Sequence, residues 1–250
     1  VSTSTKTFKT NGVTVAGGNG GGSASNQLNN PMGAVQFDGS GNMYVADYFN
    51  NRVQKWVPGS SSGVTVAGGN GAGSAANQIN QPNSIFIDLT GNIYISDQYN
   101  HRIQKWAPGA TTGITVAGGN GAGSASNQFN YPEGVFVDAS GNVYVSDLLN
   151  NRVQKWAPGA TSGVTVAGGN GLGSASNQLN YPNGVFVDAL GNVYVSDLYN
   201  NRIQKWVSGA TTGTTVAGGN GQGSASNQLY NPDGIFVDEF GNIFVSVSAL

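Results

Sequence analysis

Short segments in which hydrophobic and polar residues alternate, separated by glycine-rich turns, make up most of this chain. Between Pro132 and Gly169 three such segments follow a short run of β-branched and aromatic residues. Their alternation and their β-branched and aromatic residues predict β-strands, and the glycine and asparagine between them are typical of tight turns. No window shows the 3.6-residue period of a helix. The predicted strands span residues 134–138, 143–147, 152–156 and 164–167.

The same unit is repeated along the chain. The motif Thr-Val-Ala-Gly-Gly-Asn-Gly begins at Thr14, Thr65, Thr115, Thr165 and Thr215, which gives steps of 50 or 51 residues. A four-stranded antiparallel unit of this length that recurs along a chain is typical of a β-propeller blade. The sequence therefore predicts an all-β repeat protein.

The two ends of the chain each carry half of a unit. Residues 5–8 and 13–16 resemble a third and a fourth strand, and residues 234–238 and 242–247 resemble a first and a second strand. We expect these strands to pair in one blade and to close a five-bladed propeller, because closure removes exposed strand edges. An open fragment of a larger ring is the alternative, because the closing blade lacks the Arg-Val-Gln-Lys-Trp strand. The predicted blades of this single domain of residues 1–250 are residues 31–69, 82–119, 132–169 and 182–219, with a closing blade of residues 232–248 plus 4–18.

One unit, Pro182-Asn-Gly-Val-Phe-Val-Asp-Ala-Leu-Gly-Asn-Val-Tyr-Val-Ser-Asp-Leu-Tyr-Asn-Asn-Arg-Ile-Gln-Lys-Trp206, resembles the NHL repeat family. The shared features are a Pro-x-Gly strand, Gly-Asn-x-Tyr-Val and Asp-x-x-Asn-x-Arg, and they cover four nearly complete copies and part of a fifth. The resemblance implies a β-propeller, commonly with six blades, so five units depart from the family. NHL-like propellers include RNA binders, protein-binding scaffolds, extracellular sensors and enzymes, and the fold alone does not choose among these functions.

The charged residues argue against a nucleic-acid partner. The formal net charge is −2, and of the ten lysines and arginines only Lys6 and Lys9 lie outside the repeat pattern. We therefore expect no phosphate-binding surface, and RNA binding ranks third among the functions considered. The chain has no cysteine and no apolar run long enough to span a bilayer, and residues 1–10 do not resemble a signal peptide. We expect no membrane partner and a monomer; the compartment is unassigned, with an extracellular one favoured.

The position after the proline at the start of each first strand, which precedes a glycine in four of the five copies, is where the copies differ most in chemistry. In propellers of this kind the first strand lines the central channel, so this position should lie at the channel mouth. Carboxylate and amide oxygens that converge there form a ligand set that Ca²⁺ prefers, whereas a tolerant turn filled by unrelated polar residues is the alternative. The residues at this position are Met32, Asn83, Glu133, Asn183 and Asp233.

Pro182-Asn-Gly184 and Pro232-Asp-Gly234 also resemble motifs of calcium-dependent sugar-lactonase propellers. That resemblance implies a metal held by Glu133, Asn183 and Asp233, with Asn83 as an outer ligand, that would polarise a lactone carbonyl and activate a water. No cofactor is certain, and Ca²⁺ at the channel mouth is the one candidate.

Three other repeated or singular features favour structural interpretations. The only histidine, His101, stands in a turn position that is Asn51, Asn151 or Asn201 in other copies, and no Ser/His/Asp or Cys/His arrangement occurs. The Asp-x-x-Asn-x-Arg copies should fasten a turn or join blades. Trp56, Trp106, Trp156 and Trp206 could stack on sugars, but their position within strands favours packing between blades.

Large aromatic residues occupy two loops that should share the top face of the propeller, the face that carries the channel mouth. Several large apolar side chains at turn tips indicate a contact surface, unless they pack on neighbouring loops. Near-identical copies around a ring would also give avidity for a repetitive ligand such as a glycan. The candidate ligand-binding residues are Tyr48, Tyr99, Tyr131, Tyr181 and Tyr199.

Two functions follow from these features. The first is a non-enzymatic scaffold that binds a protein or a glycan through its top face. The second is a calcium-dependent, lactonase-like hydrolase. An excised or engineered segment without a selected activity is a further alternative, because the copies are so nearly identical.

Overall fold

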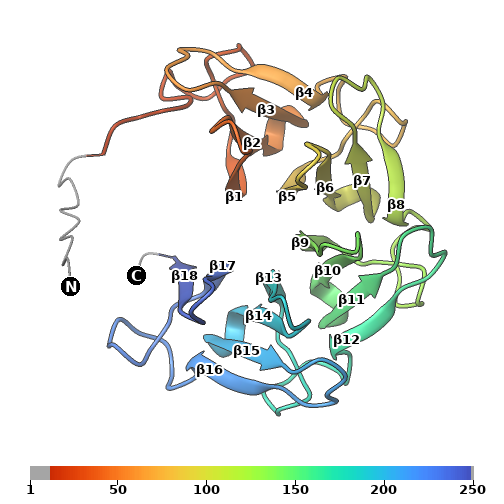
Figure 1. Cartoon of the computed structure of the whole chain (residues 1–250), viewed down its shortest axis with the longest axis vertical. Helices are drawn as coiled ribbons and strands as arrows, with labels where there is room; N and C mark the ends of the chain where they lie inside the picture. The colour runs from red at the N-terminus through yellow and green to blue at the C-terminus, as the bar shows by residue number, and fades with distance from the viewer. Residues whose placement is uncertain (1–11, 249–250) are drawn as a thin grey trace.

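The computed structural model describes residues 12–248 as five antiparallel β-sheets arranged around a central axis (Figure 1). Four sheets have four strands each, in sequence order from the axis outward, and the fifth sheet has two described strands. The first strand of every sheet lies innermost, and the fourth strands form the outer rim (Figure 1). The all-β, five-bladed propeller predicted from the sequence is confirmed.

The strands follow the predicted units closely. The first two blades are β1 (Pro31–Phe37), β2 (Met43–Asp47), β3 (Arg52–Trp56) and β4 (Val64–Gly68), then β5 (Pro82–Ile87), β6 (Ile93–Asp97), β7 (Arg102–Trp106) and β8 (Ile114–Gly118). The next two are β9 (Pro132–Val137), β10 (Val143–Asp147), β11 (Arg152–Trp156) and β12 (Val164–Gly168), then β13 (Pro182–Val187), β14 (Val193–Asp197), β15 (Arg202–Trp206) and β16 (Thr214–Gly218). The last strands are β17 (Pro232–Val237) and β18 (Ile243–Val247).

The turn between the second and third strands of each full blade is a single turn of 3₁₀-helix. These turns are η1 (Tyr48–Asn50), η2 (Gln98–Asn100), η3 (Leu148–Asn150) and η4 (Leu198–Asn200). The residue after each turn has a left-handed backbone conformation, with φ between 51° and 53°. Asparagine tolerates that conformation better than most residues, which explains why it stands there in three of four copies.

The closing blade remains a prediction. The expected third strand at residues 5–8 lies outside the described residues. The expected fourth strand at Val13–Ala16 is not a strand in the structure, because no third strand pairs with it among the described residues. Ala16 nevertheless packs against Met43 and Trp56 of the first blade. The innermost strands β1 and β17 contact each other, as a ring of five requires.

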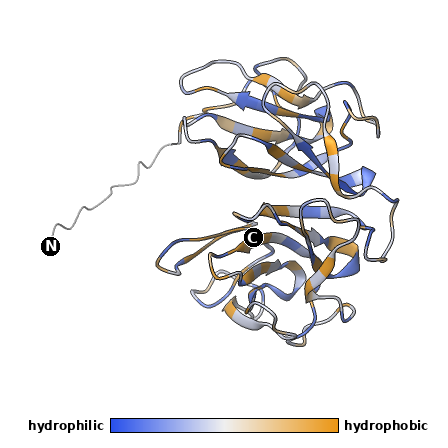
Figure 2. Cartoon of the chain, turned by 45° about the vertical axis from the view of Figure 1, so that its right-hand side comes forward, coloured by the Kyte–Doolittle hydropathy of each residue, from blue (hydrophilic) through white to orange (hydrophobic). Residues whose placement is uncertain are grey.

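The hydrophobic core lies between adjacent blades. One cluster joins Ala46 and Val53 of the first blade to Ile85, Ile95 and Trp106 of the second, and two equivalent clusters join the second blade to the third and the third to the fourth. Hydrophobic and hydrophilic residues are interspersed along the strands of the sheets (Figure 2). All four tryptophans are buried, which confirms packing and excludes a sugar-stacking role for them. No helix in residues 12–248 is long and apolar enough to span a bilayer.

Candidate functional site

The loop before each first strand and the 3₁₀ turn of the same blade lie together on one face, as the sequence predicts. Backbone hydrogen bonds join them: the amide of Leu149 donates to the carbonyl of Asn130 at 3.1 Å, and the amide of Tyr199 donates to that of Asn180 at 3.2 Å. Adjacent blades are linked on the same face. The amide of Tyr181 donates to Asn151 Oδ1 of the preceding blade at 3.0 Å. These bonds fix the positions of the side chains that this top face presents.

His101 has a structural role in the same link between blades. Its Nδ1 accepts a hydrogen bond from the backbone amide of Tyr131 at 3.3 Å, as Asn151 Oδ1 does for Tyr181. Partial burial lowers the pKa of the imidazole, whereas the charges of Asp147 and Asp97 act to raise it. His101 therefore replaces the asparagine of the other copies in geometry as well as in sequence.

Four of the five predicted top-face tyrosines form two aromatic pairs, and Tyr48 belongs to neither pair. Tyr99 and Tyr131 lie with ring centroids 5.0 Å apart, and Tyr181 and Tyr199 have the same separation. In each pair the residue from the 3₁₀ turn is exposed, with 42% of Tyr99 and 54% of Tyr199 accessible. Tyr48 is different: its hydroxyl donates to Gln98 Oε1 at 2.9 Å, and burial raises its pKa.

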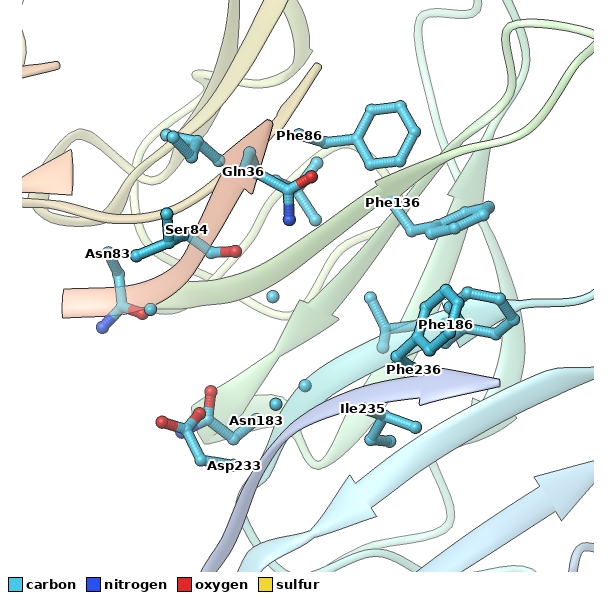
Figure 3. A pocket seen from close by; sticks show the side chains of 18 of the residues that line it. Gln36, Asn83, Ser84, Phe86, Phe136, Asn183, Phe186, Asp233, Ile235 and Phe236 are labelled. Carbon is cyan, nitrogen blue, oxygen red and sulfur yellow. The ribbon is translucent and has the colours of Figure 1, made fainter. Parts of the chain in front are cut away.

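A central cavity of about 540 Å³ runs between the innermost strands (Figure 3). Asn83, Asn183 and Asp233 line it, as their position in the repeat predicts, and Asn183 and Asp233 point toward each other. Met32 lines a different hollow, beside Val13 and Leu28. Glu133 is not part of the cavity lining; only 6% of it is accessible, although the adjoining Gly134 does line the cavity.

Glu133 is a buried carboxyl group with one satisfied oxygen. Gln98 Nε2 donates a hydrogen bond to Oε1, and Oε2 has no hydrogen-bond partner among residues 12–248. Burial raises the pKa of Glu133 to about 8; the bond from Gln98 opposes the shift, and the charge of Asp233 adds to it. A buried acid with an unpartnered oxygen is costly unless it is protonated or bound to a cation.

Gln98 is the residue of this site that the sequence interpretation did not identify as part of it. It joins Tyr48 of the first blade to Glu133 of the third through two hydrogen bonds. The sequence does carry a signal, because Gln98 is the only amide in a turn position otherwise filled by Tyr48, Leu148 and Leu198. It precedes the blade with the unusual Glu133, so two departures from the repeat coincide in space.

The oxygens near the channel mouth are of the type that a hard cation prefers. Glu133 offers the unpartnered Oε2, and Asn83, Asn183 and Asp233 add amide and carboxylate oxygens near the cavity. Such oxygens are the ligands of Ca²⁺. In residues 12–248 no three histidine, cysteine, aspartate or glutamate side chains group closely enough to hold a metal, so a cation here would depend on the asparagines.

The Asp-x-x-Asn-x-Arg motif fastens the turn within each blade. In the third blade, Arg152 Nε donates to Asp147 Oδ2 at 2.7 Å, and Asn150 donates to the same oxygen at 2.8 Å. Arg152 also reaches the carbonyl oxygens of Ala125 and Gln128 in the loop before the first strand. The equivalent arginine–aspartate pairs of the other full blades are equally short and buried, so the structural interpretation of this motif holds.

Comparisons with known proteins agree with this architecture. The NHL repeat family matches residues 129–156 and 179–206. No curated protein sequence matches the chain.

Several solved structures share the fold at low sequence identity. A chain of a nidogen–laminin complex aligns with a TM-score of 0.65 and 16% identity, over 87% of this chain and 72% of that one. A gluconolactonase from Xanthomonas campestris aligns with a TM-score of 0.63 and 11% identity, over 86% of this chain and 69% of that one. A streptogramin B lyase aligns with a TM-score of 0.59 and 13% identity, over 86% of this chain and 61% of that one. The chain thus spans about 60–70% of the length of these structures, and such identities establish the fold alone.

Proposed function

Because the chain is a β-propeller that contains NHL repeats, we propose that it is a non-enzymatic binding module whose top face binds a protein or a glycan. The observation that carries this proposal is the pair of exposed aromatic clusters, Tyr99 with Tyr131 and Tyr181 with Tyr199. Tyrosines of this kind combine a large apolar area with a polar hydroxyl, which suits both sugar rings and protein anchors. The proposed module acts as a monomer.

The repeated geometry supports recognition of an extended or repetitive ligand. The rigid hydrogen bonds between loop and turn hold each cluster before a ligand arrives, which lowers the entropy lost on binding. Phe49 and Leu149 occupy the same turn position as Tyr99 and Tyr199 in the other full blades, and both are exposed. Equivalent apolar side chains therefore recur around the face, and several weak contacts can add.

The cations of the described chain do not support binding of nucleic acid. The four arginines are buried in pairs with aspartates. The four lysines of residues 12–248 lie over tyrosine rings, with Nζ 5.0–5.4 Å from the ring centroids. Charges that are paired or dispersed in this way do not form the basic surface that phosphates require.

A double variant of the fourth-blade cluster tests the binding proposal. Tyr181 has φ 56°, so alanine would add backbone strain there; Asn231 occupies the same position with φ 42°, which makes Tyr181→Asn the matched change. On glycan and peptide arrays, Tyr181→Asn with Tyr199→Ala should lose at least about tenfold of the affinity of the wild type, or ~1.4 kcal/mol. The melting temperature should change little.

Phe240→Ala is the control for this experiment. Phe240 is 81% exposed at the tip of the β17–β18 hairpin, the turn at the end of the blade opposite the 3₁₀ turns. Its removal should leave array binding unchanged. If the tyrosine variant binds as the wild type does and Phe240→Ala does not, the top face is the wrong surface.

A cation-dependent hydrolase is the second candidate, supported by the unpartnered Oε2 of Glu133. Glu133, Asn183 and Asp233 would hold the ion, with Asn83 outside them, and the bound ion would polarise a lactone carbonyl. This candidate requires that Glu133→Gln abolish both Ca²⁺ binding and hydrolysis of a sugar lactone. If isothermal titration shows no Ca²⁺ binding to the wild type, the hydrolase is excluded.

A further inference from the structure

We propose that the central cavity, apart from the top-face tyrosine clusters, is a binding site for a small organic cation. The ligand is a primary ammonium compound with an aromatic or apolar body. The body would lie on a row of phenylalanines inside the cavity, and the ammonium group would lie at the acidic and amide end. This site does not depend on the top-face tyrosines.

The apolar part of the site is a row of four phenylalanines from consecutive blades. Phe86, Phe136, Phe186 and Phe236 occupy equivalent positions of the innermost strands, and all four line the cavity (Figure 3). Neighbouring ring centroids are 5.1, 5.1 and 5.8 Å apart. The rings thus form one continuous aromatic surface rather than isolated side chains.

These rings keep accessible surface, and in the third blade the neighbours of the ring along the chain are almost fully buried. Val135 and Val137 are each only 6% accessible, whereas Phe136 between them is half-buried. Phe86 and Phe186 are also half-buried, and Phe236 is exposed. An apolar surface that is left accessible inside a concave cavity is characteristic of a ligand site.

The first blade breaks the row with a polar side chain. Gln36 pairs with Tyr44 across the sheet as Phe136 pairs with Tyr144, so it stands in the phenylalanine position. Gln36 lines the cavity and points into it (Figure 3). A single amide among apolar rings gives the site one fixed hydrogen-bonding direction, which orients a ligand.

The charge of the cavity selects the sign of the ligand. Asp233 lies at the mouth with Asn83 and Asn183, and the described residues that line the cavity include no lysine, arginine or histidine. The faces of the phenylalanine rings are also electronegative and attract cations. At about 540 Å³ the cavity has the size of a small-molecule site.

Isothermal titration tests this inference. The affinity for 2-phenylethylammonium is compared with the affinity for 3-phenylpropionate, an anion of similar size. We expect saturable one-to-one binding of the ammonium compound, at least about tenfold tighter than binding of the carboxylate. Asp233→Asn should remove most of that preference. Phe136→Leu, which keeps an apolar core, should weaken binding of the ammonium compound about fivefold.

Two controls keep the result specific. Phe240→Ala and Leu190→Ala each remove an exposed apolar side chain that does not line the cavity, and neither should change the affinity for 2-phenylethylammonium. Absence of saturable binding to the wild type, or equal affinity for the two compounds, would overturn the inference. The inference would also be overturned if the Asp233→Asn and Phe136→Leu proteins both melted at the temperature of the wild type and both bound 2-phenylethylammonium with unchanged affinity.

Discussion

In EDTA, the protein should lose roughly 4–5 kcal/mol of unfolding free energy between pH 4.5 and pH 9 through Glu133 alone. Burial raises the pKa of this carboxyl from 4.5 to about 8 in the folded protein. Below pH 4.5 the group is protonated in both folded and unfolded chains, and its full contribution to stability is present. As the pH rises through 8, the folded state must carry a buried charge beside an unpartnered oxygen, and that contribution is lost.

Glu133→Gln isolates the effect, because glutamine keeps the shape of the side chain and does not titrate. Urea denaturation of both proteins at several pH values should show the wild type losing stability relative to the variant as the pH rises. Millimolar Ca²⁺ should restore stability above pH 8 in the wild type only, if the cation binds the carboxylate. Parallel pH profiles in EDTA would show that Glu133 is not the buried acid that the structure describes.

Asp147→Ala should lower the unfolding free energy by about 3–5 kcal/mol at neutral pH. The side chain of Asp147 is fully buried and accepts hydrogen bonds from Arg152, Asn150 and the backbone amide of Asn130. Its removal leaves the guanidinium of Arg152 buried with only carbonyl oxygens as acceptors. An unpaired buried charge accounts for most of the expected loss.

Glu239→Ala is the control for this variant, because Glu239 is an exposed acid at a hairpin tip. Its unfolding free energy should remain within about 0.5 kcal/mol of that of the wild type. A loss below 1 kcal/mol for Asp147→Ala would mean that the repeated aspartate–arginine pair does not fasten the blade.

The sequence predicts the blades well because every strand recurs in each copy and because the second and third strands alternate locally. The predicted second and third strands of the third blade, residues 143–147 and 152–156, agree with β10 and β11 residue for residue. Asn83, Asn183 and Asp233 line the cavity as expected, because each follows the proline at which its innermost strand begins.

Contacts between blades are where the sequence gives too little information. The burial of Glu133 depends on Gln98, 35 residues earlier, and Tyr48 meets Gln98 across 50 residues. The phenylalanine row was not predicted either. Val135, Phe136 and Val137 are consecutive apolar residues of the innermost strand, so alternation cannot show which side chain faces the cavity.

The most direct test of a top-face binding module is hydrogen exchange. Exchange is measured on the protein with and without the glycan or peptide selected on the arrays. We expect slower exchange in the 3₁₀ turns at residues 98–101 and 198–201, which carry Tyr99 and Tyr199. Slower exchange confined to the hairpin turns at residues 88–91 and 188–191, with no change in the 3₁₀ turns, would contradict it.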